Sequence, residues 1–137
     1  MSDSYLQHQL SLLAHVRTVL QAVAEQEIEL MPEGNSELFI ERFDEMVAEL
    51  QQSQADLYLG QEIICQIFQR YPQIAHLVPR DLLWFFGGDC LHYMPDVEIE
   101  LFQQLEDRRF AALEQGESFD WATEVELLFM PVLTAKQ

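Results

Sequence analysis

Apolar side chains recur at helical spacing along almost the whole chain, and this periodicity restricts the fold more than any other feature. Within residues 4–30 the apolar positions follow one another at steps of three or four residues: Leu6, Leu10, Leu13, Val16, Leu20 and Val23. These steps place the side chains on one face of an α-helix. We therefore predict one long N-terminal helix that ends before Pro32 and Gly34, with Asn35 or Ser36 as the cap of the next helix.

Five further helical segments follow, each with a proline, a glycine or a polar residue near its ends. The pattern predicts helices over residues 36–50, 56–71, 79–93 and 95–116, and a short last helix after Asp120. Gly87 and Gly88 lie inside the helix over 79–93; the alternative is that they end one short helix and that Asp89 caps another. No segment shows the period-2 pattern of a strand. The sequence thus predicts an all-α fold, a compact bundle of five or six helices in a single domain over residues 1–137.

The chain is strongly acidic, with 24 Asp and Glu against 7 Lys and Arg and a formal charge of −17 at pH 7. A hydrophobic content of 49% excludes a disordered chain. Because the negative charge repels phosphate backbones and anionic lipids, we expect neither direct nucleic-acid binding nor membrane association. The longest apolar run, Leu82 to Phe86, is far shorter than the about 20 residues of a membrane span. With only two cysteines and no targeting segment in view, we expect a cytoplasmic protein.

The acidic residues are concentrated in two stretches. Residues 25–49 contain nine acidic residues and one Arg, and residues 96–126 contain ten acidic residues and two Arg. The stretch between them, 50–95, has only four acidic residues and two Arg, but it holds seven of the fifteen aromatic residues. The charge pattern therefore describes two acidic flanks around a nearly neutral, aromatic centre.

One group of glutamates in the first flank has a regular geometry. Four of them recur at every fourth residue of the predicted helix, opposite its apolar face: Glu37, Glu41, Glu45 and Glu49. Like charges at this spacing destabilise a helix by about 0.2–0.5 kcal/mol per pair. The group is either a solvated surface that keeps the protein soluble, or a docking face for a basic partner or for divalent cations.

The aromatic centre contains an unusual segment. Trp84, Phe85 and Phe86 end a run of five large apolar residues and are followed by Gly87 and Gly88. A helix that is apolar all round has to be buried on more than one side. Three arrangements can provide such burial: core packing around a helix break, the interface of a homodimer, or a ligand pocket. The paired glycines would allow another backbone to approach closely.

The same segment holds residues with chemical potential. Asp89 and His92 are three residues apart, with Cys90 between them. Carboxylate and imidazole at this spacing occur in di-iron bundles, which need a second such pair. No second pair is present here, so we favour a structural Asp–His hydrogen bond over a metal or catalytic role. Cys65 falls on the apolar face of its predicted helix and is expected to be a small buried side chain.

Two further carboxylate pairs are candidate metal ligands, because all-α hydrolases hold Mg²⁺ with acidic residues at helical spacing. Glu41 and Asp44 form one such pair, and Glu117 and Asp120 form another. Asp120, however, directly precedes a predicted helix and is better explained as its cap. A chain with 24 acidic residues also produces such pairs by chance.

The sequence therefore predicts a small acidic interaction module of the adaptor, regulator or inhibitor type, homodimeric, which binds a basic protein partner and uses no cofactor. Enzymatic activity is not indicated by any motif. Two alternatives remain open. One is a ligand- or metal-binding bundle, with hydrolase activity as one option, whose pocket lies around Trp84, Asp89, Cys90 and His92. The other is a DNA mimic that inhibits a nucleic-acid-binding protein.

Overall fold

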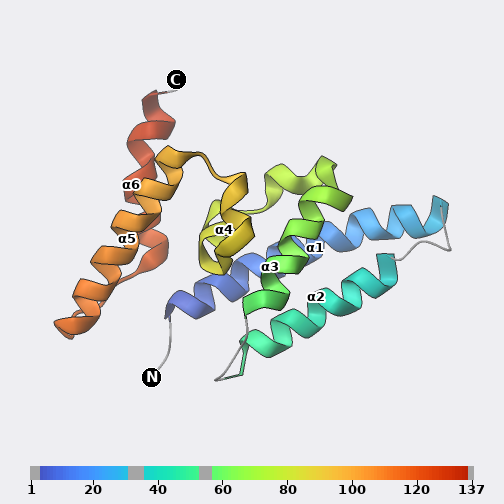
Figure 1. The fold of residues 1–137 in the computed structure, drawn as a ribbon, viewed down its shortest axis with the longest axis horizontal. Helices are drawn as coiled ribbons and strands as arrows, with labels where there is room; N and C mark the ends of the chain where they lie inside the picture. The colour runs from blue at the N-terminus through green and yellow to red at the C-terminus, as the bar shows by residue number, and fades with distance from the viewer. Residues whose placement is uncertain (1–3, 31–35, 53–56, 136–137) are drawn as a thin grey trace.

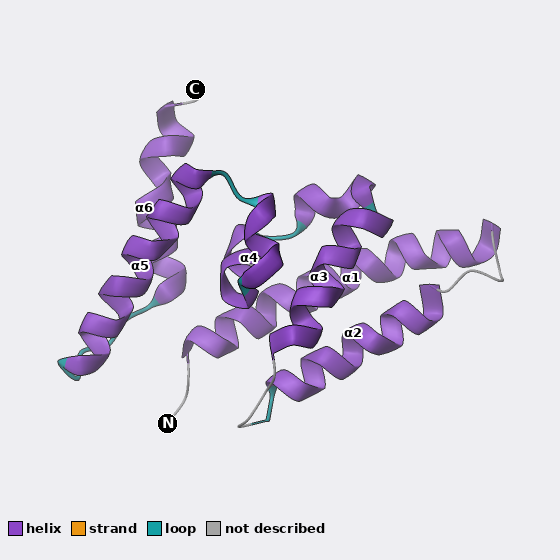
Figure 2. Cartoon of the chain, viewed as in Figure 1, coloured by secondary structure: helices purple, strands orange, loops and turns teal. Residues whose placement is uncertain are grey.

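Helices account for nearly all of the described structure, which is a computed structural model covering residues 4–30, 36–52 and 57–135 (Figures 1 and 2). These residues contain no strand. In chain order the elements are α1 (Ser4–Leu30), α2 (Ser36–Leu50), α3 (Leu57–Arg70), the 3₁₀ helix η1 (Pro72–Leu77), α4 (Arg80–Phe86), the 3₁₀ helix η2 (Gly88–Tyr93), α5 (Asp96–Glu114) and α6 (Trp121–Ala135). The all-α prediction is confirmed, and two short 3₁₀ helices are added to the expected helices.

The helices form two connected parts. α1 and α2 run antiparallel beside each other, and α3 packs against α2 (Figure 1). The short α4 lies at the centre, in contact with α1, α3 and η2. α5 and α6 form a second antiparallel hairpin, and α6 contacts α1 (Figure 1).

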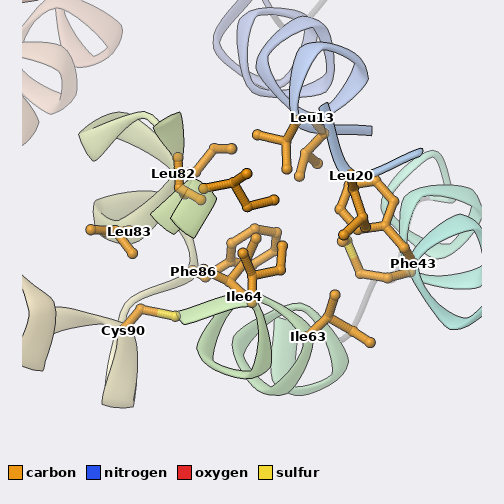
Figure 3. Packing of buried hydrophobic residues seen from close by; sticks show 14 of the residues in the cluster. Leu13, Leu20, Phe43, Ile63, Ile64, Leu82, Leu83, Phe86 and Cys90 are labelled. Atoms are coloured by element: carbon orange, nitrogen blue, oxygen red, sulfur yellow. The ribbon is translucent and has the colours of Figure 1, made fainter. Parts of the chain in front are cut away.

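The core lies where α1, α2, α3 and α4 meet. Leu13 and Leu20 of α1 are fully buried there, on the predicted apolar face of the long helix. Figure 3 shows them in one cluster with buried side chains of the other elements: Phe43 of α2, Ile63 and Ile64 of α3, Leu82, Leu83 and Phe86 of α4, and Cys90 of η2. Burial of large apolar side chains stabilises a fold by about 1.5–3 kcal/mol each, so this cluster holds the first four helices together.

The prediction of a continuous helix over 79–93 is wrong, and its alternative, a break at the paired glycines, is correct. α4 ends at Phe86, and the N–H of Gly87 donates to the Leu83 carbonyl at 3.0 Å as the last helical hydrogen bond. Gly87 has φ 66° and Gly88 has φ 55°. Only glycine adopts this left-handed region without strain, and it interrupts the helical ladder. Asp89 is not a cap; it lies in the first turn of η2.

Other helix ends follow the expected signals with small shifts. Pro79 and Pro95 occupy the positions immediately before α4 and α5. Gly116, with φ 70°, terminates α5 while the N–H of Glu117 donates to the carbonyl of Ala112 at 2.9 Å, which is the pattern of a Schellman motif. Asp120 directly precedes α6 and accepts a hydrogen bond from the Thr123 hydroxyl.

The expected capping residue Asn35 lies outside the described residues. Ser36 is the first residue of α2, and its buried hydroxyl lies 3.0 Å from the Tyr71 hydroxyl. This hydrogen bond ties the start of α2 to the end of α3.

Candidate functional site

The four glutamates of α2 form a continuous exposed acidic row. Glu37, Glu41, Glu45 and Glu49 are all exposed, while the opposite side of the helix is buried. At 1.5 Å per residue, the Cα positions of the row extend about 18 Å along the helix axis. The core thus fixes which face of α2 points outward, and that face is the one the sequence predicted. We call these four residues the acidic row.

The acidic row has no cationic partner among the described residues. The two arginines nearest in sequence are paired elsewhere: Arg17 Nε donates to Asp44 at 2.9 Å, and Arg42 lies 3.3 Å from Glu62. The hydrogen bond with Asp44 raises the pKa of Arg17 above its usual value, although burial of the guanidinium opposes it. The row therefore faces solvent as an uncompensated negative surface.

An apolar side chain lies within this acidic face. Leu38 follows Glu37 on α2 and is 55% exposed, and helical spacing puts it beside Glu41. Leu38 also borders a groove of about 370 Å³ between α2 and α3. The groove is lined by Leu38, Phe39, Arg42, Gln66, Gln69 and Arg70. The acidic row and an apolar contact point therefore share one side of the molecule.

In each of the two carboxylate pairs considered as metal ligands, the aspartate is used in another contact. Asp44 accepts two hydrogen bonds from the Arg17 guanidinium, at 2.9 and 3.2 Å. Asp120 accepts from Thr123 at the start of α6. Within the described ranges there is no group of three or more His, Cys, Asp or Glu side chains that could hold a metal ion.

The aromatic segment is covered by side chains of the same chain. Phe86 is 2% exposed. The ring of Trp84 stacks on Phe102 with 5.9 Å between centroids, and Phe85 meets the edge of Tyr5 at 5.7 Å. The packing that suggested a subunit interface is thus supplied in part within one chain, where Trp84 and Phe85 are half-buried. A homodimer through this segment stays a prediction of the sequence.

The four residues of the predicted ligand pocket point in different directions. Trp84 faces α5, whereas the side chains of His92 and Asp89 are 81% and 87% exposed. His92 Nε2 lies 3.8 Å from Asp89 Oδ1, too far for the hydrogen bond we expected. Cys90 is fully buried. These side chains do not converge on one ligand.

Two polar contacts in the structure have no counterpart in the sequence analysis. The first joins Cys65, which is only half-buried, to Cys90, with 3.8 Å between the sulfur atoms. The second joins three helices, because Asp81 Oδ2 lies 3.0 Å from both His8 Nε2 and Trp121 Nε1. The partners are 25, 73 and 40 residues apart in the chain. Helical periodicity reports only neighbours within a turn, so no local signal could have revealed these contacts.

No helix in the described ranges is both long and apolar enough to span a bilayer. Comparison with curated proteins and with solved structures finds no match. A family model does match, and it covers residues 1–137, the whole of the chain. The chain therefore belongs to the PA2817-like family.

Proposed function

We propose that this protein is a small interaction module that binds a basic protein partner through the acidic row of α2. The observation that carries the proposal is the absence of any cationic partner for Glu37, Glu41, Glu45 and Glu49 within the described part of the chain. In a helix, three successive like-charge contacts at i, i+4 destabilise the fold by about 1 kcal/mol in total. A basic partner would relieve this repulsion.

The groove beside the acidic row supports the same proposal. Binding energy at interfaces comes mainly from apolar contacts, whereas charged groups speed encounter and reject wrong partners. Leu38, 55% exposed next to a groove of about 370 Å³, offers the apolar contact. We infer a partner segment that carries Lys or Arg side chains beside at least one apolar residue.

The proposal includes a cytoplasmic location. Cys65 and Cys90 are both free thiols, which suits a compartment that keeps cysteines reduced. The adaptor, regulator or inhibitor role remains open within the proposal, since each of them requires the same acidic face. A DNA mimic would use that face as well, and competition by duplex DNA for the captured partner would distinguish it.

The test compares two variants with equal charge. In the row variant, Glu37, Glu41, Glu45 and Glu49 are each replaced by Gln. In the control variant, four exposed glutamates without ion pairs on or beside the α5–α6 hairpin are replaced by Gln: Glu100, Glu114, Glu117 and Glu126. Each immobilised protein is used to capture partners from a lysate of its own cells at low and high salt, and captured proteins are identified by mass spectrometry.

We expect the wild type and the control variant to capture the same basic partner at low salt. The amount of that partner captured by the row variant should be lower by about tenfold or more. Raising the salt concentration should slow association with the wild type. A Leu38→Ser variant should bind more weakly but keep the salt dependence. Equal losses in the row and control variants would show that only net charge matters, and the proposed face would then be wrong.

A further inference from the structure

The only two cysteines of this chain are in contact, although they belong to different elements. Cys65 lies on α3 and Cys90 on η2, and their sulfur atoms are 3.8 Å apart. Figure 3 shows the Cys90 side chain directed from η2 toward α3. A disulfide bond requires an S–S distance of about 2.0 Å, so the two sulfur atoms need to approach by roughly 2 Å. Rotation of the half-buried Cys65 side chain about its Cα–Cβ bond can supply much of this movement.

Neighbouring contacts hold η2 and the end of α4 that precedes it against α3. The side-chain amide of Gln61 donates to the Phe86 carbonyl at 2.8 Å, and the Cys90 thiol lies 3.7 Å from the Gln61 carbonyl oxygen. A side chain at Gly88 would come within 2.7 Å of the Gln61 amide oxygen. The close backbone approach at Gly88 therefore brings Cys90 to Cys65, one helical turn beyond Gln61.

The two thiols differ in their access to solvent. Cys90 is fully buried, whereas Cys65 is half-buried and lines an open cavity of about 290 Å³. Asp89 and Gln61 line the same cavity. A small oxidant can therefore reach Cys65 from solvent, while Cys90 is placed behind it.

We propose that Cys65 and Cys90 form an oxidation-sensitive dithiol, which a hydroperoxide converts into an intramolecular disulfide that fixes η2 to α3. Cys65 is oxidised first: its sulfur attacks the peroxide, the O–O bond breaks, and sulfenic acid forms with release of water or of the alcohol. The Cys90 sulfur then attacks the Cys65 sulfur, and the hydroxyl group leaves as water with the thiol proton. The two thiols are oxidised together by two electrons, and one peroxide is reduced.

The surroundings of the two cysteines determine how fast the dithiol is oxidised. Burial raises the pKa of both thiols, that of Cys90 to about 12, and the negative charge of Asp89 adds to the effect. The thiolate is the reactive form, so the dithiol should oxidise slowly at neutral pH. The pair is therefore suited to sustained rather than brief exposure to oxidant.

The experiment treats the purified full chain with hydrogen peroxide and follows its intact mass and its accessible thiols after denaturation. We expect a loss of about two mass units, disappearance of both thiols, and a chain that stays monomeric on a non-reducing gel. The oxidised protein should unfold at a higher urea concentration than the reduced one, and dithiothreitol should reverse both changes. In Cys65→Ser, the buried Cys90 should remain reduced at the same peroxide dose.

Cys90→Ala provides a second readout, because the Cys65 sulfenic acid then has no partner and should react with dimedone. If Cys90→Ala fails to fold, the mass measurement on the wild type decides alone. A mass increase through stepwise addition of oxygen, without the loss of about two units, would overturn the proposal. Dimers linked through Cys65 would overturn it as well.

Discussion

The indole N–H of Trp121 donates a hydrogen bond of 3.0 Å to Asp81 Oδ2, and this bond joins the first residue of α6 to the first turn of α4. Trp121 is only 1% exposed, and its ring packs against the ring of Tyr5 of α1 with 4.8 Å between the centroids. The same carboxylate oxygen lies 3.0 Å from His8 Nε2. One acidic side chain, 14% exposed, thus links three helices that are distant in the sequence.

Replacement of Asp81 by Ala should destabilise the protein by about 2–3 kcal/mol, because the buried indole N–H and the imidazole both lose their acceptor. Urea unfolding measures the change. Asp89→Ala removes the same type of side chain at a position that is 87% exposed, and it should change the free energy of unfolding by less than about 0.5 kcal/mol. Similar effects in the two variants would contradict the structural role of Asp81.

Gly60→Ala should destabilise the protein by at least about 1–3 kcal/mol through overpacking. A Cβ atom at this position would lie 2.1 Å from Cε1 of Phe86, whose ring is buried in the core. Gly116→Ala is the control, since nothing lies within 4 Å of its Cβ position; its left-handed backbone should cost about 1 kcal/mol. Phe86→Leu should partly rescue Gly60→Ala in a double-mutant cycle, whereas additive effects would argue against the contact.

Glu45→Gln should stabilise the protein by about 0.4–1 kcal/mol, because it removes the repulsion with both Glu41 and Glu49. Glu37→Gln removes one such contact but also a negative charge in the first turn of α2, where the helix dipole favours it. Its net effect should be close to zero. The difference between the two variants should shrink in high salt. A Glu45→Gln variant less stable than the wild type would indicate a cationic partner for the acidic row.

Stability should fall at alkaline pH because of Cys90. Its pKa is raised from 9.0 to about 12 in the folded protein, mainly by burial. Above pH 9 the unfolded chain loses this proton and the folded chain keeps it, so the free energy of unfolding decreases by at most about 1.4 kcal/mol per pH unit. Below pH 9 the contribution of Cys90 to the free energy of unfolding is fully present. Between pH 9 and about pH 12 this contribution declines. Urea titrations at several pH values should show that the free energy of unfolding of Cys90→Ala falls less steeply with pH over this window than that of the wild type. An equal pH dependence in the two proteins would contradict the assignment.

Local spacing was sufficient for much of the fold. The apolar stripe of α1 and the outward direction of the acidic row both follow from a period of 3.6 residues, because each depends only on neighbours within one helix. Gly116 indicated the end of α5 and Asp120 indicated the start of α6, because the conformational preferences of these residues are also local. The same reasoning left the break at Gly87 and Gly88 as one of two alternatives.

Contacts between elements were decided by the tertiary structure alone. The sequence indicated that Trp84, Phe85 and Phe86 had to be buried, but only the packing of α4 against the other helices shows that the chain buries Phe86 itself and covers Trp84 and Phe85 in part. Likewise, Cys65 and Cys90 are brought together across 25 residues, and Asp81 joins residues up to 73 positions away. The sequence by itself determined the long helices, the apolar face of α1 and the exposed face of α2, since these properties arise within a helical turn. Which faces meet depends on how the helices pack in three dimensions, and that packing placed the thiol pair and the Asp81 contacts.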